Sequence, residues 1–182
     1  MQTIPITNKA LYERELHRRN SLYPEIWNLL DAVNDPEIPA LSIWDLGILR
    51  DVEFDEDGDQ YIITITPTYS GCPAMDTIKE DVISHLKENG ITNCSAKLKL
   101  SPAWTTDDMT EQGRNKLRAY GIAPPNDVAG GCMKYVTPPA HVKCPHCSST
   151  NTVLVSEFGS TACKALFKCE DCYEPFDFFK NI

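Results

Sequence analysis

The sequence predicts an α+β protein, in which a small β-sheet domain with helices on one face precedes a short cysteine-rich β domain. Apolar residues alternate between helical and strand-like spacing along the first two thirds of the chain. Prolines and glycines then interrupt this pattern between residues 123 and 140, and most of the cysteines follow. A length of 182 residues suits one ordinary domain with a small addition.

The first predicted helix covers residues 24–33 (PEIWNLLDAV), where apolar residues recur three and four positions apart and Pro24 suits the first turn. The prolines of NDPEIP oppose its continuation. The runs LGILRDVEF and QYIITITPT flank the acidic turn DEDGD, and both are rich in alternating or β-branched residues. They predict an antiparallel hairpin.

The stretch TPTYSGCPAM leads from this hairpin into a second predicted helix, residues 74–89, which Gly90 can end. The run ITNCSAKLKL alternates as a half-buried strand does. A last helix is expected from Thr106 or Asp107 to Tyr120. The elements therefore follow the order helix, strand, strand, helix, strand, helix.

The composition predicts four regions along the chain. They are an N-terminal arm at residues 1–22, the sheet domain at 23–122, a linker at 123–140 and the cysteine-rich domain at 141–182. The last region is too short for a self-sufficient hydrophobic core, so we expect a metal to stabilise it.

Bulk properties exclude several classes of function. The net charge of −9 opposes nonspecific nucleic-acid binding, which needs a basic face. No apolar run is long enough to cross a bilayer. The amino terminus resembles neither a secretory signal nor a transit peptide, so we expect a cytoplasmic protein. In that reducing compartment, cysteines favour metal binding or thiol chemistry over disulfides.

The cysteine-rich tail contains two CxxC pairs, which predict a zinc-ribbon-like domain with a single four-thiolate site. Zinc is the first choice, because it accepts four thiolates and needs no redox partner, and iron is the second. Cys163 is either a buried apolar residue or an additional ligand. The predicted metal ligands are Cys144, Cys147, Cys169 and Cys172.

Cys72 is the second candidate site, because it stands between Gly71 and Pro73 at the expected start of a helix. The positive end of the helix dipole favours a thiolate there, so we expect a lowered pKa. Such a thiolate could act as a nucleophile, a redox centre or a metal ligand. The alternative is an inert residue in a strand-to-helix turn. Asp35 and Glu37 could lie at the same sheet end and orient a thiolate-bound metal.

The segments DPEIPALSIWDLGILRDV and ITPTYSGCPAM together resemble the hallmark motifs of a small α/β iron–sulfur assembly family that includes the bacterial SufT-type proteins. AWTTDDMTEQGRNKLRAYGIAPP, the CxxC pairs and SEFGSTACKALFKC resemble its PaaD (PaaJ) branch. Trp44 is bulkier than the aliphatic residue expected there, and Asp108 stands where an aromatic residue is common. The family positions present in this chain are Asp35, Glu37, Thr66, Ser70, Cys72, Pro73, Cys144, Cys147, Cys163, Cys169 and Cys172.

The resemblance implies a SufT-like sheet domain and an accessory or maturation subunit of the multicomponent phenylacetyl-CoA ring-1,2-epoxidase of aerobic phenylacetate degradation. It implies assistance with an iron–sulfur or iron centre in an oxygenase or reductase subunit, with Cys72 holding iron or a cluster transiently. The alternatives are a zinc-ribbon docking subunit without metal transfer and a cysteine-dependent enzyme. A homodimer through an exposed edge strand is also left open.

Overall fold

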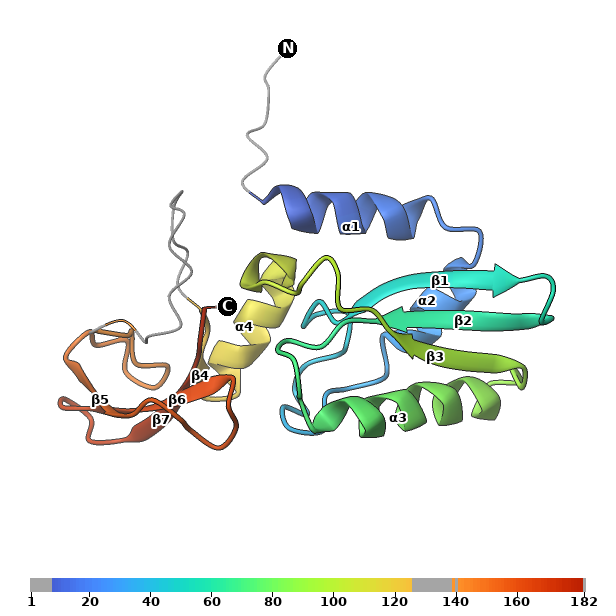
Figure 1. Cartoon of the computed structure of the whole chain (residues 1–182). Coiled ribbons are helices and arrows are strands. Elements are labelled where there is room, and N and C mark those ends of the chain that lie inside the picture. Colours follow the sequence, from blue (N-terminus) through green and yellow to red (C-terminus); the bar gives the residue numbers. More distant parts are fainter. Residues whose placement is uncertain (1–7, 126–138, 140, 182) are drawn as a thin grey trace, which may run out of the picture. The chain divides into compact units, whose positions relative to one another are not determined.

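The computed structural model describes residues 8–125, 139 and 141–181, and the chain divides into two compact units, Met1–Thr110 and Glu111–Ile182. Each unit contains its own β-sheet (Figure 1). The α+β class predicted from the sequence is confirmed. None of the helices in the described residues is long and apolar enough to span a membrane.

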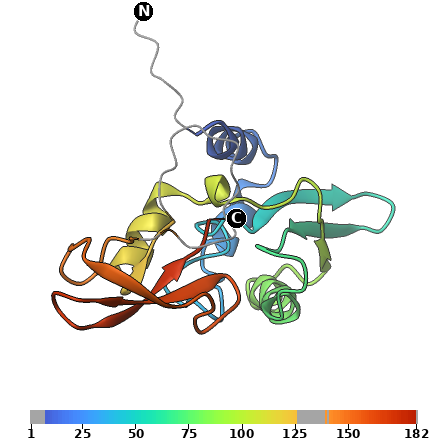
Figure 2. The ribbon, with the colours of Figure 1, turned by 60° about the vertical axis from the view of Figure 1, so that its left-hand side comes forward.

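The first unit contains a three-stranded sheet in the order β1-β2-β3. Strands β1 (Leu49–Asp55) and β2 (Gln60–Ile65) form the predicted antiparallel hairpin, which Figure 2 shows from another side. Strand β3 (Cys94–Leu98) pairs in parallel with β2. A parallel neighbour requires a crossover, and helix α3 (Ala74–Glu88) supplies it.

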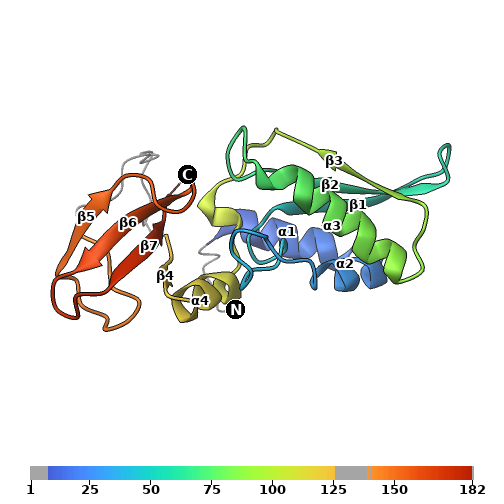
Figure 3. The ribbon, with the colours of Figure 1, turned by 90° about the horizontal axis from the view of Figure 1, so that it is seen from below.

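Helices α2 (Pro24–Leu30) and α3 pack against each other and build the core with the sheet (Figures 1 and 3). Gly90 adopts a φ of +88° just after α3, where a left-handed residue ends the helix as predicted. The apolar stripe of each helix is the part that is buried. Fully buried members of this core are Ile26, Leu30, Ile63, Ile65, Ile78, Val82 and Leu86.

Helix α1 (Lys9–Arg19) occupies most of the region that was expected to be an N-terminal arm. The Asn8 side chain caps it by accepting a hydrogen bond from the Leu11 N–H at 3.0 Å. Arg14 is the one buried residue of this helix, and Tyr12 and Leu16 are exposed. Because a cation rather than an apolar stripe faces inward, hydrophobic periodicity does not reveal α1.

The predicted helix from Thr106 or Asp107 to Tyr120 is interrupted. The chain forms a short 3₁₀ helix, η1 (Thr106–Asp108), and then helix α4 (Glu111–Ala119) in the second unit. Thr110 stands between them, and its N–H donates to the Asp45 carbonyl at 2.9 Å. This long-range bond stops the helix from continuing.

The second unit contains a four-stranded sheet in the order β4-β7-β6-β5 (Figure 3). Its strands are β4 (Ile122–Ala123), β5 (Thr152–Ser156), β6 (Lys164–Cys169) and β7 (Pro175–Phe179). Strands β5, β6 and β7 are antiparallel to their neighbours, and β4 runs parallel to β7.

The division after Thr110 differs from the domain limits expected from the sequence. Helix α4 and strand β4 fall in the second unit, although α4 was expected in the sheet domain and Ala123 in the linker. Most of the expected linker, residues 126–138 and 140, lies outside the described residues. A strand of two residues has no periodicity from which it could be predicted.

Candidate functional site

The two CxxC pairs form matching turns at one end of the second unit. The Ser148 N–H donates to the Cys144 carbonyl at 3.0 Å, and the Cys169 N–H donates to the Glu174 carbonyl at 3.0 Å. In each turn the residue after the second cysteine is left-handed, with φ of 65° at Ser148 and 64° at Tyr173. These tight turns direct both cysteines of each pair toward the same point.

The four sulfur atoms lie within 4.8 Å of one another, and no other potential metal-ligand group of three or more exists among the described residues. Cys144 Sγ is 3.8 Å from Cys172 Sγ, and Cys147 Sγ is 3.5 Å from Cys169 Sγ. A tetrahedral zinc with Zn–S bonds of about 2.3 Å separates its sulfurs by about 3.8 Å. The arrangement therefore fits one tetrahedral metal ion and leaves no open ligand position.

The backbone around the cluster supports thiolates. N–H groups of Cys172 and Asp171 lower the pKa of Cys169 to about 7. For Cys172, the Glu174 N–H lowers the pKa, but burial and the neighbouring thiols outweigh it and raise the pKa to about 12. Four adjacent thiolates repel one another, so a bound cation is what makes full ionisation favourable.

Asp171 connects the two turns, a role that was not predicted from the sequence. Its carboxylate accepts hydrogen bonds from Ser149 Oγ at 2.5 Å and Asn151 Nδ2 at 2.7 Å, and these bonds lower the pKa of Asp171. The two donors follow the first CxxC pair, whereas Asp171 lies within the second. The position of an aspartate inside CEDC is the one sequence signal that could have pointed to this clamp.

An aromatic core supports the cluster from the sheet. Phe167 stacks on Phe176 with ring centroids 5.9 Å apart and meets Phe178 edge to face at 5.8 Å. Val142 and two of the cysteines, Cys144 and Cys169, belong to the same buried group. The metal cluster and this small core thus stabilise each other.

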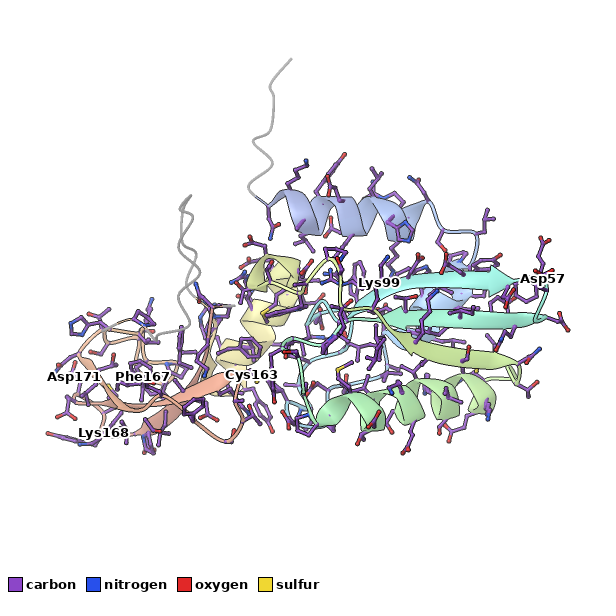
Figure 4. All side chains as sticks on the ribbon, in the orientation of Figure 1. Asp57, Lys99, Cys163, Phe167, Lys168 and Asp171 are labelled. Carbon is purple, nitrogen blue, oxygen red and sulfur yellow. The ribbon has the colours of Figure 1, made fainter. Side chains whose placement is uncertain are left out.

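Cys163 does not join the metal cluster. It precedes β6, whereas Cys169 ends that strand, and six extended residues span roughly 20 Å. Figure 4 shows Cys163 and the cluster residue Asp171 at opposite ends of this unit. Cys163 is buried, and its Sγ lies 3.0 Å from Thr161 Oγ1. Of the two interpretations that the sequence left open, the geometry favours burial over metal ligation.

The two histidines of the tail also lie outside the four-sulfur cluster. His141 and His146 are exposed, and four cysteines already complete a tetrahedral shell.

Cys72 lies in the connection between β2 and α3, directly before Pro73, which caps the helix. Gly71 has a φ of +92°, and an added Cβ would meet no atom within 4 Å, so this glycine serves the turn rather than close packing. The Cys72 side chain is half-buried, and Ser70 is exposed. Thr66 is buried directly after β2, and its N–H donates to the Ile48 carbonyl at 2.9 Å.

The loop from Asp35 to Leu41 approaches Cys72, because the charges of Glu37 and Asp35 both act on the thiol. Asp35 is buried and shapes this loop: its Oδ1 accepts hydrogen bonds from the N–H groups of Glu37 at 2.8 Å and Ile38 at 2.9 Å. The Asp35 N–H donates to the Leu41 carbonyl at 2.9 Å, which closes the loop.

The expected lowering of the Cys72 pKa is wrong, because the environment raises it. Burial of the thiol is the largest cause, and the negative charges of Glu37 and Asp35 add to it. An N–H from Ala74 and the Tyr69 hydroxyl stabilise the thiolate without reversing the balance. Desolvation and the two carboxylates, which the position at a helix start does not reveal, therefore outweigh the helix dipole.

Asp45, the third carboxylate of the upstream loop, has a structural role. It is buried, and its Oδ1 accepts a hydrogen bond from the Thr110 hydroxyl at 2.8 Å. Around Cys72, the described part of the chain holds no set of three converging cysteine, histidine or carboxylate ligands. Cys72 therefore offers one thiolate beside two carboxylates rather than a finished metal site.

The fold and sites define a two-part protein: an iron–sulfur assembly type of sheet domain joined to a four-cysteine zinc ribbon. Two family models agree with these parts. The model described as an iron-sulfur cluster assembly protein matches residues 24–96, and the model described as the PaaD zinc beta ribbon domain matches residues 132–180.

A protein of Escherichia coli (strain K12), named as the D component of 1,2-phenylacetyl-CoA epoxidase, is 51% identical over 87% of this chain and 92% of its own length. The chain belongs to the family of these epoxidase components. An Fe-S protein maturation auxiliary factor of Porphyromonas gingivalis (strain ATCC BAA-308 / W83) is 35% identical over 51% of this chain and 88% of its own length. The corresponding factor YitW of Bacillus subtilis (strain 168) is 33% identical over 53% and 94%. The family resemblance predicted from the sequence is confirmed.

Proposed function

We propose that this chain is an accessory subunit of 1,2-phenylacetyl-CoA epoxidase that helps to assemble an iron–sulfur or iron centre in an oxygenase or reductase subunit. Support comes from the relative named for that epoxidase and from the two relatives named as Fe-S protein maturation factors. The first relative supports membership of the complex, and the others support the kind of task.

The observation that carries the proposal is the contrast between the two thiol sites. The ribbon cluster has four converging sulfurs, as a closed structural site does. Cys72 is half-buried beside Glu37 and Asp35 and lacks a complete ligand set among the described residues. Iron held by Cys72 needs further ligands from another molecule, and shared ligation suits a metal that is passed on.

The raised pKa of Cys72 is compatible with transient binding. At neutral pH the thiol stays protonated, and iron must displace the proton before it binds. This proton competition weakens iron binding in the absence of the client. The same property argues against a thiol hydrolase, because the nucleophile of such an enzyme is an activated thiolate. His85 lies about 16 Å along α3 from the helix start, too far to act as the base.

The test is the substitution Cys72→Ser, with Cys94→Ser as its matched control, because both thiols are half-exposed cysteines of the first unit. Epoxidase subunits are matured with each variant, and their iron, sulfide and ring-epoxidation activity are measured. Cys72→Ser should abolish the gain in activity and metal content that the wild-type chain gives. Cys94→Ser should preserve both.

The second candidate function is a docking subunit without metal transfer. The closed cysteine cluster favours it, since a structural zinc can shape a surface and take no part in iron chemistry. Metal and sulfide analysis of protein prepared without oxygen separates the candidates. Iron that is present in the wild type and lost in Cys72→Ser supports transfer. Zinc alone in both proteins, with normal metal content in the matured epoxidase, supports docking.

A further inference from the structure

The two sheets have four outer strands, and three of these resist pairing with another chain. Strand β1 carries the charged residues Asp51, Glu53 and Asp55. Strand β3 carries Lys97, and β4 is only two residues long. Charges and short length are the ways in which natural sheets prevent contact between their edges.

Strand β5 is the exception. Its sequence, TVLVS, has no charged residue, and it forms the outer strand of the second sheet beside β6. Val153 is 46% exposed and Val155 is 57% exposed, whereas Thr152 at the start of the strand is buried. An uncharged outer strand with exposed β-branched residues is prone to pair with another strand.

The loop after β5 extends this apolar surface. Phe158 is 64% exposed, and the Lys180 ammonium supports its ring from 4.5 Å. Lys180 also donates to the Glu157 carbonyl at 3.2 Å, and the Gly159 N–H donates to the Lys164 carbonyl at 2.8 Å. The loop is therefore held in place before any partner binds, which lowers the entropic cost of association.

The charge distribution indicates which partner can approach. Residues 1–110 contain 9 Lys and Arg against 19 Asp and Glu, a net charge of −10, and residues 111–182 contain 8 against 7, a net charge of +1. Two copies of the first unit repel each other, whereas two copies of the second do not. A second copy of this chain can thus reach β5 without an electrostatic penalty.

From these observations we infer that two copies of the chain form a dimer in which their β5 strands pair side by side and antiparallel. Pairing centred on Leu154 sets Val153 of one copy opposite Val155 of the other. The same patch then serves both copies, as two-fold symmetry requires. Each strand provides what the other lacks, namely an uncharged extended backbone and an apolar cross-strand neighbour.

The dimer is weak and depends on concentration. Strand β5 has five residues, and its pairing register with β6 shifts between Leu154 and Ser156. A bulge of this kind bends a strand and limits the length over which it can pair. A short paired segment falls at the small end of protein interfaces, where association is transient. The inference is independent of Cys72.

The experiment measures the mass of the full zinc-loaded chain by sedimentation equilibrium over a range of concentrations. Wild type should approach twice the chain mass of 20.4 kDa at high concentration. Val155→Lys should remain a monomer, because it places two cations in the paired strands. Leu100→Lys is the matched control, since Leu100 is 63% exposed beside the outer strand of the other sheet, and it should dimerise as wild type does.

Zinc content and circular dichroism establish that each variant is folded. A wild-type chain that stays monomeric at its solubility limit would overturn the inference. So would a dimer that persists in Val155→Lys, or one that Leu100→Lys disrupts instead. If Val155→Lys fails to fold, Val153→Lys replaces it with the same expected loss of dimer.

Discussion

The carboxylate of Asp108 is a point at which separate segments of the first unit meet. Its oxygens accept a bidentate pair from Arg50 at 2.6 and 2.9 Å, and the Thr105 N–H donates to Oδ2 at 2.9 Å. The Asp108 backbone carbonyl accepts a hydrogen bond from Arg14. The side chains of Arg50 and Asp108 are only 14% and 8% exposed, so each charge depends on the other for compensation. The departure from the family pattern at Asp108 thus has a structural reason.

At the same scale, Glu37 should control the reactivity of Cys72. Alkylation by iodoacetamide requires the thiolate, and the raised pKa places the midpoint of the Cys72 reaction above the ordinary cysteine value of 9.0. Glu37→Gln removes a negative charge that disfavours the thiolate, so the midpoint should move to lower pH. Mass spectrometry of the peptide that contains Cys72 measures the rate against pH.

The matched control is Glu80→Gln, an exposed carboxylate of α3 that does not act on Cys72. It should leave the midpoint where the wild type has it. An unchanged or higher midpoint in Glu37→Gln would show that this carboxylate does not act on the thiol.

At the scale of elements, α1 is attached by cations on aromatic rings. The Arg14 guanidinium lies 4.3 Å from the Trp44 ring centroid, and that of Arg18 lies 4.8 Å from it. Trp27 meets Trp44 edge to face at 5.7 Å. Each such contact contributes roughly 0.5 to 2 kcal/mol. The bulky Trp44, which departs from the family pattern, is the platform on which this helix rests.

Trp44→Leu should therefore detach α1 while the sheet remains folded. We expect the free energy of unfolding to fall by about 2 to 3 kcal/mol, because two cation–π contacts and one aromatic pair are lost. Hydrogen exchange should show loss of protection in α1 before other elements. Tyr12→Leu, at an exposed aromatic of the same helix, should change stability by less than about 0.5 kcal/mol. Equal effects of the two substitutions would contradict the platform role.

At the scale of the whole molecule, the two units differ in charge and in the source of their stability. The first unit carries the acidic charge and a core of aliphatic residues. The second is nearly neutral and combines a small aromatic core with four converging thiols. Metal ligation and hydrophobic burial thus stabilise different parts of one chain.

Metal removal should consequently unfold one unit and spare the other. Chelation of zinc, or Cys169→Ala, should abolish hydrogen-exchange protection in β5, β6 and β7, because structural zinc contributes on the order of 10 kcal/mol to folding. Amides of β1, β2 and α3 should keep their protection. Cys163→Ala, which removes a thiol outside the metal cluster, should retain the zinc. Simultaneous loss of protection in both units would refute their independence.

Local patterns in the sequence were enough to predict the α2, β1–β2, α3 and β3 elements and the convergence of the two CxxC pairs. Hydrophobic periodicity, a turn sequence and a short cysteine spacing each act within a few residues, so they can be read before the chain folds.

Only the tertiary structure decided the rest. It turned residues 9–19 into a helix through a buried arginine, ended the first unit at Thr110 and raised the pKa of Cys72. It also separated Cys163 from the metal cluster. Burial and neighbouring charge depend on residues far apart in the chain, and these non-local quantities set the protonation of a thiol and the limits of a domain.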